Sequence, residues 1–183
     1  MKLRRRYRSL TELLAHELVR DEDAETQQLI RRLRHVRKRR WFSRAEFLEM
    51  CRWKSPRARR QYERNPAPTI RRVSRLVLTT RSERQRLALL TSLRGVGVPM
   101  ASAILTLIDP ERYGVLDIRV WRLLFGIRSV TQNPRGQGFT VDQCCRYLAT
   151  LRHHARRLGV TVRTVEYSLF CCHKKYQTGN LYG

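Results

Sequence analysis

The amino-acid sequence predicts an all-α protein. Apolar residues recur at spacings of three and four along most of the chain, and the alternation typical of β-strands is nearly absent. Ser, Thr, Pro and Gly also stand where they favour the beginning or the end of a helix. With 183 residues the chain is long enough to bury a core, so we expect residues 1–183 to form a single compact unit.

The first half of the chain carries helix signals separated by charged or proline-rich breaks. The acidic cluster Asp21–Glu25 is expected to divide one long apolar pattern into two helices. Ser43 and Glu46 have the spacing of a capping box, and the stretch Asn65–Pro68 predicts a turn. We therefore expect helices over residues 9–39, broken at 21–25, and over 43–51, 69–78 and 82–93.

The second half of the chain continues the helical pattern around one loop. Residues 133–138, NPRGQG, are rich in turn formers. Gly159 is suited to end the preceding helix in the left-handed conformation. Helices are expected from about residue 98, from 117 to about 125, over 141–158 and over 162–175.

The chain is strongly basic. It holds 39 Lys and Arg residues against 15 Asp and Glu residues, a formal net charge of +24. Such a charge repels itself unless a polyanion is near, and nucleic acid is a polyanion whose condensed counterions cationic groups displace. A GC-rich genome is an alternative reason for the many arginines. That alternative does not explain what would compensate the large positive charge of the protein. The composition therefore predicts a nucleic-acid partner.

The stretch Leu93–Leu105, LRGVGVPMASAIL, predicts two helices joined by a tight turn. Gly95 and Gly97 permit backbone conformations that a side chain would block, and they let a phosphate approach the main chain. Pro99 suits the first turn of the second helix, whose free amides and positive dipole end favour an anion. We expect these residues to contact DNA: Arg94, Gly95, Val96, Gly97 and Val98, together with Arg57 and Arg119.

Asp117 follows in the stretch Tyr113–Trp121, YGVLDIRVW, at the expected start of a helix. A helix N-terminus favours an ionised carboxylate. Such a group can stabilise the positive charge that develops on deoxyribose when a glycosidic bond breaks, and it can orient or deprotonate the attacking water. Asp117 is therefore the candidate catalytic residue, with a simple helix cap as the alternative interpretation.

Residues 93–124 resemble the helix-hairpin-helix DNA glycosylase superfamily. The shared pattern is a hairpin, a helix of small residues and an aspartate that opens the next helix: Leu93, Gly95, Val96 and Gly97, then residues 101–105, then Asp117. The resemblance implies a two-lobed all-α fold with the active-site cleft between the lobes. It also implies a monomeric enzyme that flips a modified base out of double-stranded DNA and cleaves the bond between base and sugar. Residues 66–158 would form the lobe with the hairpin, and residues 1–65 with 159–183 the second lobe.

The resemblance further implies which reaction to expect. Family members that nick the strand carry a lysine two residues after the second glycine of the hairpin, where this chain has Pro99. We therefore expect a monofunctional glycosylase that leaves an abasic site, with Lys54 as the lysine that could replace the missing amine. Many members hold a monovalent cation at hairpin carbonyls, which match Leu93 and Gly95. The iron–sulfur motif of other members is missing here, so no cofactor is expected to be required beyond a structural Na⁺ or K⁺.

A flipped base needs flat walls and polar groups that recognise its edge. The segment Arg52–Arg57, RWKSPR, combines an aromatic ring, cations and a hydroxyl group in a constrained turn. Two further aromatic residues lie close to Asp117 in the sequence. The predicted base pocket therefore consists of Trp53, Lys54, Tyr113 and Trp121.

Other functions fit parts of the sequence. A non-catalytic helix-hairpin-helix DNA-binding protein would need the hairpin and the basic surface but no carboxylate. A nuclease would need clustered carboxylates for Mg²⁺, and few acids occur outside residues 12–25. A zinc site is disfavoured because Cys144–Cys145 and Cys171–Cys172 are adjacent pairs.

Several properties bear on where the protein acts. No apolar run approaches the ~20 residues of a membrane span, and the basic N-terminal stretch lacks the apolar core of a signal peptide. We therefore expect no membrane partner and a cytoplasmic location, with the five cysteines as thiols. There the enzyme would serve either base excision repair or antiphage defence against hypermodified, for example glucosylated, phage bases.

Overall fold

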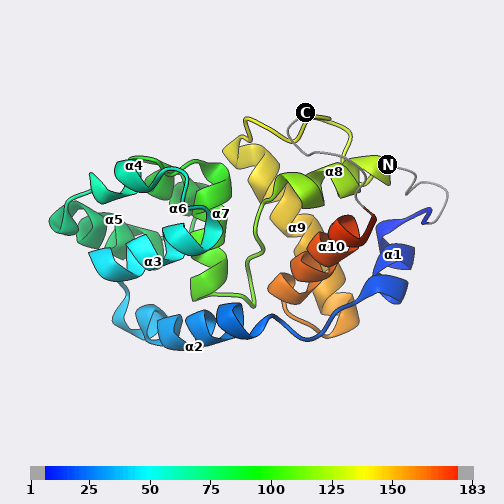
Figure 1. The fold of residues 1–183 in the computed structure, drawn as a ribbon, viewed down its shortest axis with the longest axis horizontal. Helices are drawn as coiled ribbons and strands as arrows, with labels where there is room; N and C mark the ends of the chain where they lie inside the picture. Colours follow the sequence, from blue (N-terminus) through cyan, green and yellow to red (C-terminus); the bar gives the residue numbers. More distant parts are fainter. Residues whose placement is uncertain (1–6, 177–183) are drawn as a thin grey trace.

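The computed structural model describes residues 7–176, and within this range all the regular elements are helices (Figure 1). The prediction of an all-α fold is therefore confirmed. No helix in this range is both long and apolar enough to cross a membrane. The described helices are α1 (Leu10–Glu17), α2 (Ala24–Arg39), α3 (Arg44–Lys54), α4 (Arg59–Glu63), α5 (Ala67–Thr79), α6 (Glu83–Thr91), α7 (Val98–Ile108), α8 (Ile118–Gly126), α9 (Val141–Leu158) and α10 (Val162–Tyr176).

Local sequence signals account for most helix boundaries. Asp23 caps α2 by accepting a hydrogen bond from the Thr26 amide at 2.9 Å, so the predicted break between the first two helices is confirmed. Ser43 and Glu46 form the predicted capping box at the start of α3. Gly159 ends α9 with a φ of 62°, as predicted. The short helix α4 has no side-chain cap and is not predicted from the sequence.

Helix α7 occupies the centre of the core. All its residues except Pro99 are buried, because the helix is almost entirely apolar and its two polar residues, Ser102 and Thr106, are hydrogen-bonded within the protein. Helices α2, α3 and α6 pack on α7, whereas α10 packs on α1, α8 and α9. Figure 1 shows α3 to α7 gathered at one end of the molecule, α1 and α8 to α10 at the other end, and α2 along one side.

Several of these contacts cross the predicted lobe boundaries. Helices α2 and α3, assigned to the second lobe, pack on α7 of the hairpin lobe. The buried apolar side chains of the described residues accordingly form one connected core. The boundaries at 65–66 and 158–159 stay a prediction, and their outer parts, 1–6 and 177–183, lie outside the described residues.

The turn between α6 and α7 is built around Gly95. Its φ of 81° lies in the region that favours glycine. A Cβ atom there would lie 2.8 Å from the Cβ of Gln61 and 2.9 Å from Cδ1 of Tyr62. Asn65 holds the turn, because its side chain accepts from the Arg94 amide at 2.9 Å and donates to the Arg94 carbonyl at 3.0 Å. Two helices joined by a tight glycine turn are therefore present where the sequence predicts them.

Candidate active site

Asp117 is the N-cap of α8. Its Oδ1 accepts a hydrogen bond from the Arg119 amide at 2.8 Å, which leaves Oδ2 available for another partner. The residue thus lies at the positive end of a helix, as predicted, with its backbone in an extended conformation. The helix cap, which is the alternative interpretation, is present, and it engages only one of the two carboxylate oxygens.

Buried side chains from other helices hold the extended segment that leads into Asp117. Glu166 of α10 accepts from the Val115 amide at 3.2 Å, and the Tyr147 hydroxyl of α9 donates to the Val115 carbonyl at 2.8 Å. The Ser102 hydroxyl of α7 accepts from the Leu116 amide at 2.8 Å. Because both residues before the aspartate are fixed in this way, its carboxylate position is set by three helices distant in sequence.

Lys54, the last residue of α3, forms an ion pair with Asp117. Its Nζ atom lies 2.5 Å from Oδ2 of the carboxylate, and the two side chains are 19% and 13% exposed. Lys54 is predicted from the sequence as a residue of the base pocket and as a possible substitute amine, but no sequence signal predicts a direct pair with Asp117. The fold brings together these two residues from distant parts of the chain.

Two effects act in opposite directions on the Asp117 carboxyl group. Burial raises its pKa, whereas the positive charge of Lys54 and the hydrogen bonds from Lys54 and the Arg119 amide lower it. The lowering effects win, so the pKa of Asp117 lies below its usual value. Asp117 is therefore ionised at neutral pH, the form that stabilises a developing positive charge.

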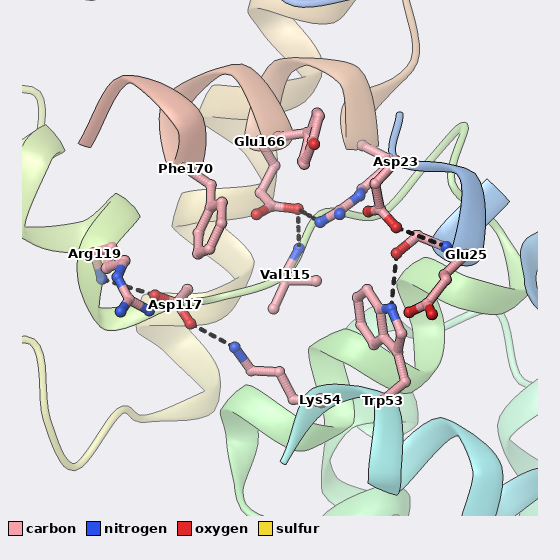
Figure 2. Close-up of a pocket in the computed structure, with 12 residues that line it drawn as sticks. Asp23, Glu25, Trp53, Lys54, Val115, Asp117, Arg119, Glu166 and Phe170 are labelled. Carbon is pink, nitrogen blue, oxygen red and sulfur yellow. Dashed lines mark hydrogen bonds and ion pairs between the residues drawn. The ribbon is translucent and has the colours of Figure 1, made fainter. Parts of the chain in front are cut away.

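A cavity of about 380 Å³ opens beside this ion pair (Figure 2). Its size falls within the ~300–1,000 Å³ typical of small-molecule sites. The Arg119 guanidinium group lies 5.5 Å from the ring centre of Phe170 at the Asp117 end. The aromatic ring and the charges at this end come from Phe170, Lys54, Asp117 and Arg119.

Trp53 and Tyr167 form the aromatic part of the cavity wall away from Asp117. The Trp53 indole N–H donates to the Thr26 hydroxyl at 2.8 Å, which fixes the ring. The Arg163 guanidinium group lies 5.5 Å from the Trp53 ring and 5.0 Å from the Tyr167 ring. These contacts join α2, α3 and α10 on one side of the cavity.

Arg163 is buried and is held by two carboxylates. Its guanidinium group donates to Glu22 at 2.5 and 3.0 Å and also pairs with Glu166. Burial raises the pKa of Glu166, and the positive charge of Arg163 lowers it without cancelling the rise. No local pattern in the sequence predicts this network. The sequence favours a packing role for Tyr167 and Phe170, although three- and four-residue spacing on α10 places them on one helix face.

The structure places two of the predicted pocket residues outside this cavity. Tyr113 is buried, and its hydroxyl accepts from Arg86 at 2.9 Å beside a separate, smaller cavity. Trp121 is buried with its ring 5.1 Å from that of Phe139, and its indole N–H donates to the Asn133 carbonyl at 2.9 Å. Trp121 is close to Asp117 in the sequence, but its position on α8 directs its ring away from the cavity, so this closeness does not place it in the cavity wall. The aromatic walls are instead Trp53, Tyr167 and Phe170.

The predicted DNA-contacting residues divide by exposure. Arg57, Arg94, Gly95 and Gly97 are exposed, whereas the side chains of Val96 and Val98 are buried, so these valines could contact DNA only through their backbone. Arg119 lines the cavity. At the predicted cation position, the Leu93 carbonyl accepts from the Val96 amide at 3.1 Å. Within residues 7–176, His, Cys, Asp and Glu side chains form no cluster of three or more that could hold a metal ion.

Comparisons with known proteins gave no match: no protein-family model, curated protein or solved structure is significantly similar to this chain.

Proposed function

We propose that this protein is a DNA glycosylase that excises a modified base from double-stranded DNA. The observation that carries the proposal is the ionised Asp117, paired with Lys54, at the edge of a cavity large enough for a flipped base. A carboxylate at that place can stabilise the oxocarbenium-like charge on deoxyribose. Aromatic rings on the walls suit a flat, unstacked base.

The engagement of DNA rests on charge and on the hairpin. The net charge of +24 favours a polyanion, and the turn at Gly95 and Gly97 presents exposed backbone at the start of α7. We propose that this turn holds a phosphate while the base enters the cavity, in a two-lobed arrangement of the helix-hairpin-helix type. A monomer acting in the cytoplasm, with a structural Na⁺ or K⁺ at the hairpin, completes this proposal.

In the hydrolytic reaction, Asp117 acts through water. The carboxylate orients a water molecule towards C1′ of the flipped nucleotide and accepts its proton. The bond between the water oxygen and C1′ forms, and the bond from C1′ to the base breaks with its electron pair moving to the base. Proton uptake by the base completes the step and leaves an abasic site.

The ion pair with Lys54 favours a second candidate reaction, in which the same enzyme also nicks the strand. After transfer of a proton from Lys54 to Asp117, the amine forms a bond to C1′ while the bond to the base breaks. Opening of the sugar ring then gives an imine between Lys54 and the sugar, as O4′ takes up the proton that the attached amine loses. Loss of a proton from C2′ then expels the 3′ phosphate with the electron pair of its bond to C3′. The 2.5 Å separation of Nζ and Oδ2 is the observation that favours this route.

The test uses duplexes that each carry one modified base, drawn from alkylated, oxidised, deaminated and glucosylated bases. We expect abasic-site formation with at least one duplex, and loss of this product with retained DNA affinity in Asp117→Asn. Survival of product in Asp117→Asn would contradict the catalytic assignment. DNA binding without product from any duplex would favour the non-catalytic DNA-binding protein.

Two further readouts separate the remaining candidates. Borohydride reduces an imine, so covalent trapping of the protein on DNA that is lost in Lys54→Met would assign the strand-nicking reaction. Product without trapping would assign hydrolysis alone. Activity that resists chelation would exclude a magnesium-dependent nuclease. The identity of the excised base then separates repair of damaged DNA from defence against modified phage DNA.

A further inference from the structure

Arg119 is the one cation in the described wall of the cavity beside Asp117 that forms no ion pair. Of the other two, Lys54 pairs with Asp117, and Arg163 is held by two carboxylates. Within residues 7–176, no side-chain N–H of Arg119 donates a hydrogen bond, and its Nε atom is buried, so water does not supply the missing acceptor there. An unsatisfied buried donor is unfavourable and rare in native folds, which points to an acceptor that arrives with a ligand.

The other side-chain donors in the described wall of the cavity already have partners. The Trp53 indole donates to Thr26, whose own hydroxyl is hydrogen-bonded to a carboxylate of α2. The Tyr167 hydroxyl is hydrogen-bonded to the Cys171 thiol. A ligand that brings an acceptor into this cavity therefore finds its unengaged side-chain donor in Arg119.

Two contacts hold Arg119 at the Asp117 end of the cavity (Figure 2). Its backbone amide donates to Oδ1 of Asp117 at 2.8 Å, and its guanidinium group lies 5.5 Å from the ring centre of Phe170. Burial, followed by the positive charge of Arg119, lowers the pKa of the nearby His173 to about 4. An uncompensated positive charge thus lies next to the candidate catalytic carboxylate, and His173 is neutral at pH 7.

This charge has a role when a glycosidic bond breaks. A cation near C1′ opposes the positive charge that Asp117 stabilises, unless a negative charge forms beside it. The departing base acquires a negative charge, because it keeps the electron pair of the broken bond. In a base with a carbonyl group that charge spreads onto the oxygen, and a donor already in place there stabilises the transition state.

We propose that Arg119 donates to a carbonyl oxygen of the flipped base and stabilises the negative charge that this base acquires as it departs; this rests on the proposed glycosylase function. The bond from C1′ to the base breaks with its electron pair on the base, and the charge spreads to the oxygen bound by Arg119. A proton from water then neutralises the base, while the guanidinium group keeps its own protons. The substrate class is therefore bases that carry a carbonyl oxygen.

A phosphate of the DNA backbone is the alternative ligand of Arg119. It is disfavoured because the guanidinium group packs near the Phe170 ring in the cavity wall and Nε is buried. Backbone phosphates instead meet exposed cations, such as Arg94 in the turn between α6 and α7.

The first test measures DNA binding without catalysis, in Asp117→Asn. Two duplexes carry, opposite guanine, either uracil or difluorobenzene, which has a similar shape but fluorine in place of both carbonyl oxygens. Adding Arg119→Met should weaken binding of the uracil duplex by about tenfold or more relative to the difluorobenzene duplex, equivalent to about 1.4 kcal/mol. The cost of unpairing each base is the same for both protein variants and cancels in this cycle.

The second test measures base release in single turnovers, from uracil and from fluorouracil with its fluorine at C5. The fluorine helps the departing base to carry negative charge, so this base depends less on an external cation. In Arg119→Met, release of uracil should slow by about tenfold or more, and release of fluorouracil by clearly less. Arg119→Lys keeps the charge and should recover part of the loss.

The controls separate a base contact from general loss of charge or of folding. Arg94→Met removes the same charge from an exposed position, so it should weaken both duplexes equally and reduce the slope of log Kd against log salt by about 1. It should leave the ratio of fluorouracil to uracil release unchanged. Asparagine caps helices as well as aspartate does, and Arg119→Met keeps the backbone amide that donates to residue 117, so α8 keeps its N-cap.

Each outcome decides between the two proposals. Equal losses for the two bases in Arg119→Met, as in Arg94→Met, would overturn the base contact and assign Arg119 to a phosphate. Base release with an unchanged ratio in Arg119→Met would overturn the stabilisation of the departing base and leave the glycosylase function standing. A binding loss specific to uracil, without release of any modified base, would contradict the glycosylase function while supporting the contact of Arg119 with the carbonyl oxygen.

Discussion

The turn between α6 and α7 is held by backbone conformation and close neutral contacts, whereas the cavity beside Asp117 is held by charged groups from several helices. The turn depends on Gly95, whose missing side chain leaves room for α4, and on the amide group of Asn65. The cavity depends on charged groups from α3, α8 and α10 that neutralise one another. The turn is therefore sensitive to volume and backbone conformation, and the cavity is sensitive to charge.

The largest effect on stability is expected at the buried charges of the cavity. Glu166→Gln leaves an amide oxygen for the Val115 amide but removes the charge that faces Arg163, and losing one partner of a buried pair costs about 3–5 kcal/mol. Chemical denaturation measures this loss. Glu49→Gln, in an exposed pair with Arg32, should cost less than ~1 kcal/mol, and equal losses in the two variants would contradict the comparison.

The next effect concerns the turn. Gly95→Ala should destabilise the protein by about 3 kcal/mol, because a left-handed conformation costs about 1–2 kcal/mol for alanine and the new Cβ overlaps Gln61 and Tyr62. Gly138→Ala is the matched control, since Gly138 has a similar φ of 60° and no atom within 4 Å of an added Cβ. Thermal unfolding should show a clearly smaller loss for Gly138→Ala; equal losses would mean that the contact with α4 is unimportant.

A change in pH dependence is expected at the ion pair. Lys54 lowers the pKa of Asp117, so Lys54→Met should raise that pKa and move the acidic limb of the activity profile to higher pH. The stability that the ionised carboxylate contributes is present above its unfolded pKa and is lost as the pH falls through the lowered folded pKa. Lys38→Met removes an exposed lysine and should leave the profile unchanged. A profile that does not move in Lys54→Met would show that Asp117 does not control the rate.

The smallest effect is expected at the aromatic wall. Trp53→Phe keeps a ring in the cavity but loses the indole donor to Thr26, a hydrogen bond worth about 0.5–1.5 kcal/mol. Base release should fall by less than tenfold. Thr26→Val removes the same hydrogen bond from the other side, so a double-mutant cycle should show coupling between the two positions.

The sequence predicts helices better than it predicts the pocket. The caps at Asp23 and Ser43 and the left-handed Gly159 are recognisable because the interaction that ends each helix spans only a few residues. The helix α4 escapes prediction, since it is too short to show a period and lacks a cap. Tyr113 and Trp121 lie outside the cavity beside Asp117, because closeness in sequence does not determine which cavity a side chain faces: Tyr113 precedes α8, and Trp121 lies on α8.

By itself the sequence determined the all-α class, the basic charge, the glycine turn and the position of Asp117 at a helix start, because these follow from residue type and local spacing. Only the tertiary structure decided that Lys54 pairs with Asp117 and that Glu166 holds the segment before it. It also decided that the carboxylates of α2 face the same cavity. These contacts join residues far apart in the chain, and their geometry depends on how α7 and α10 pack against their neighbours.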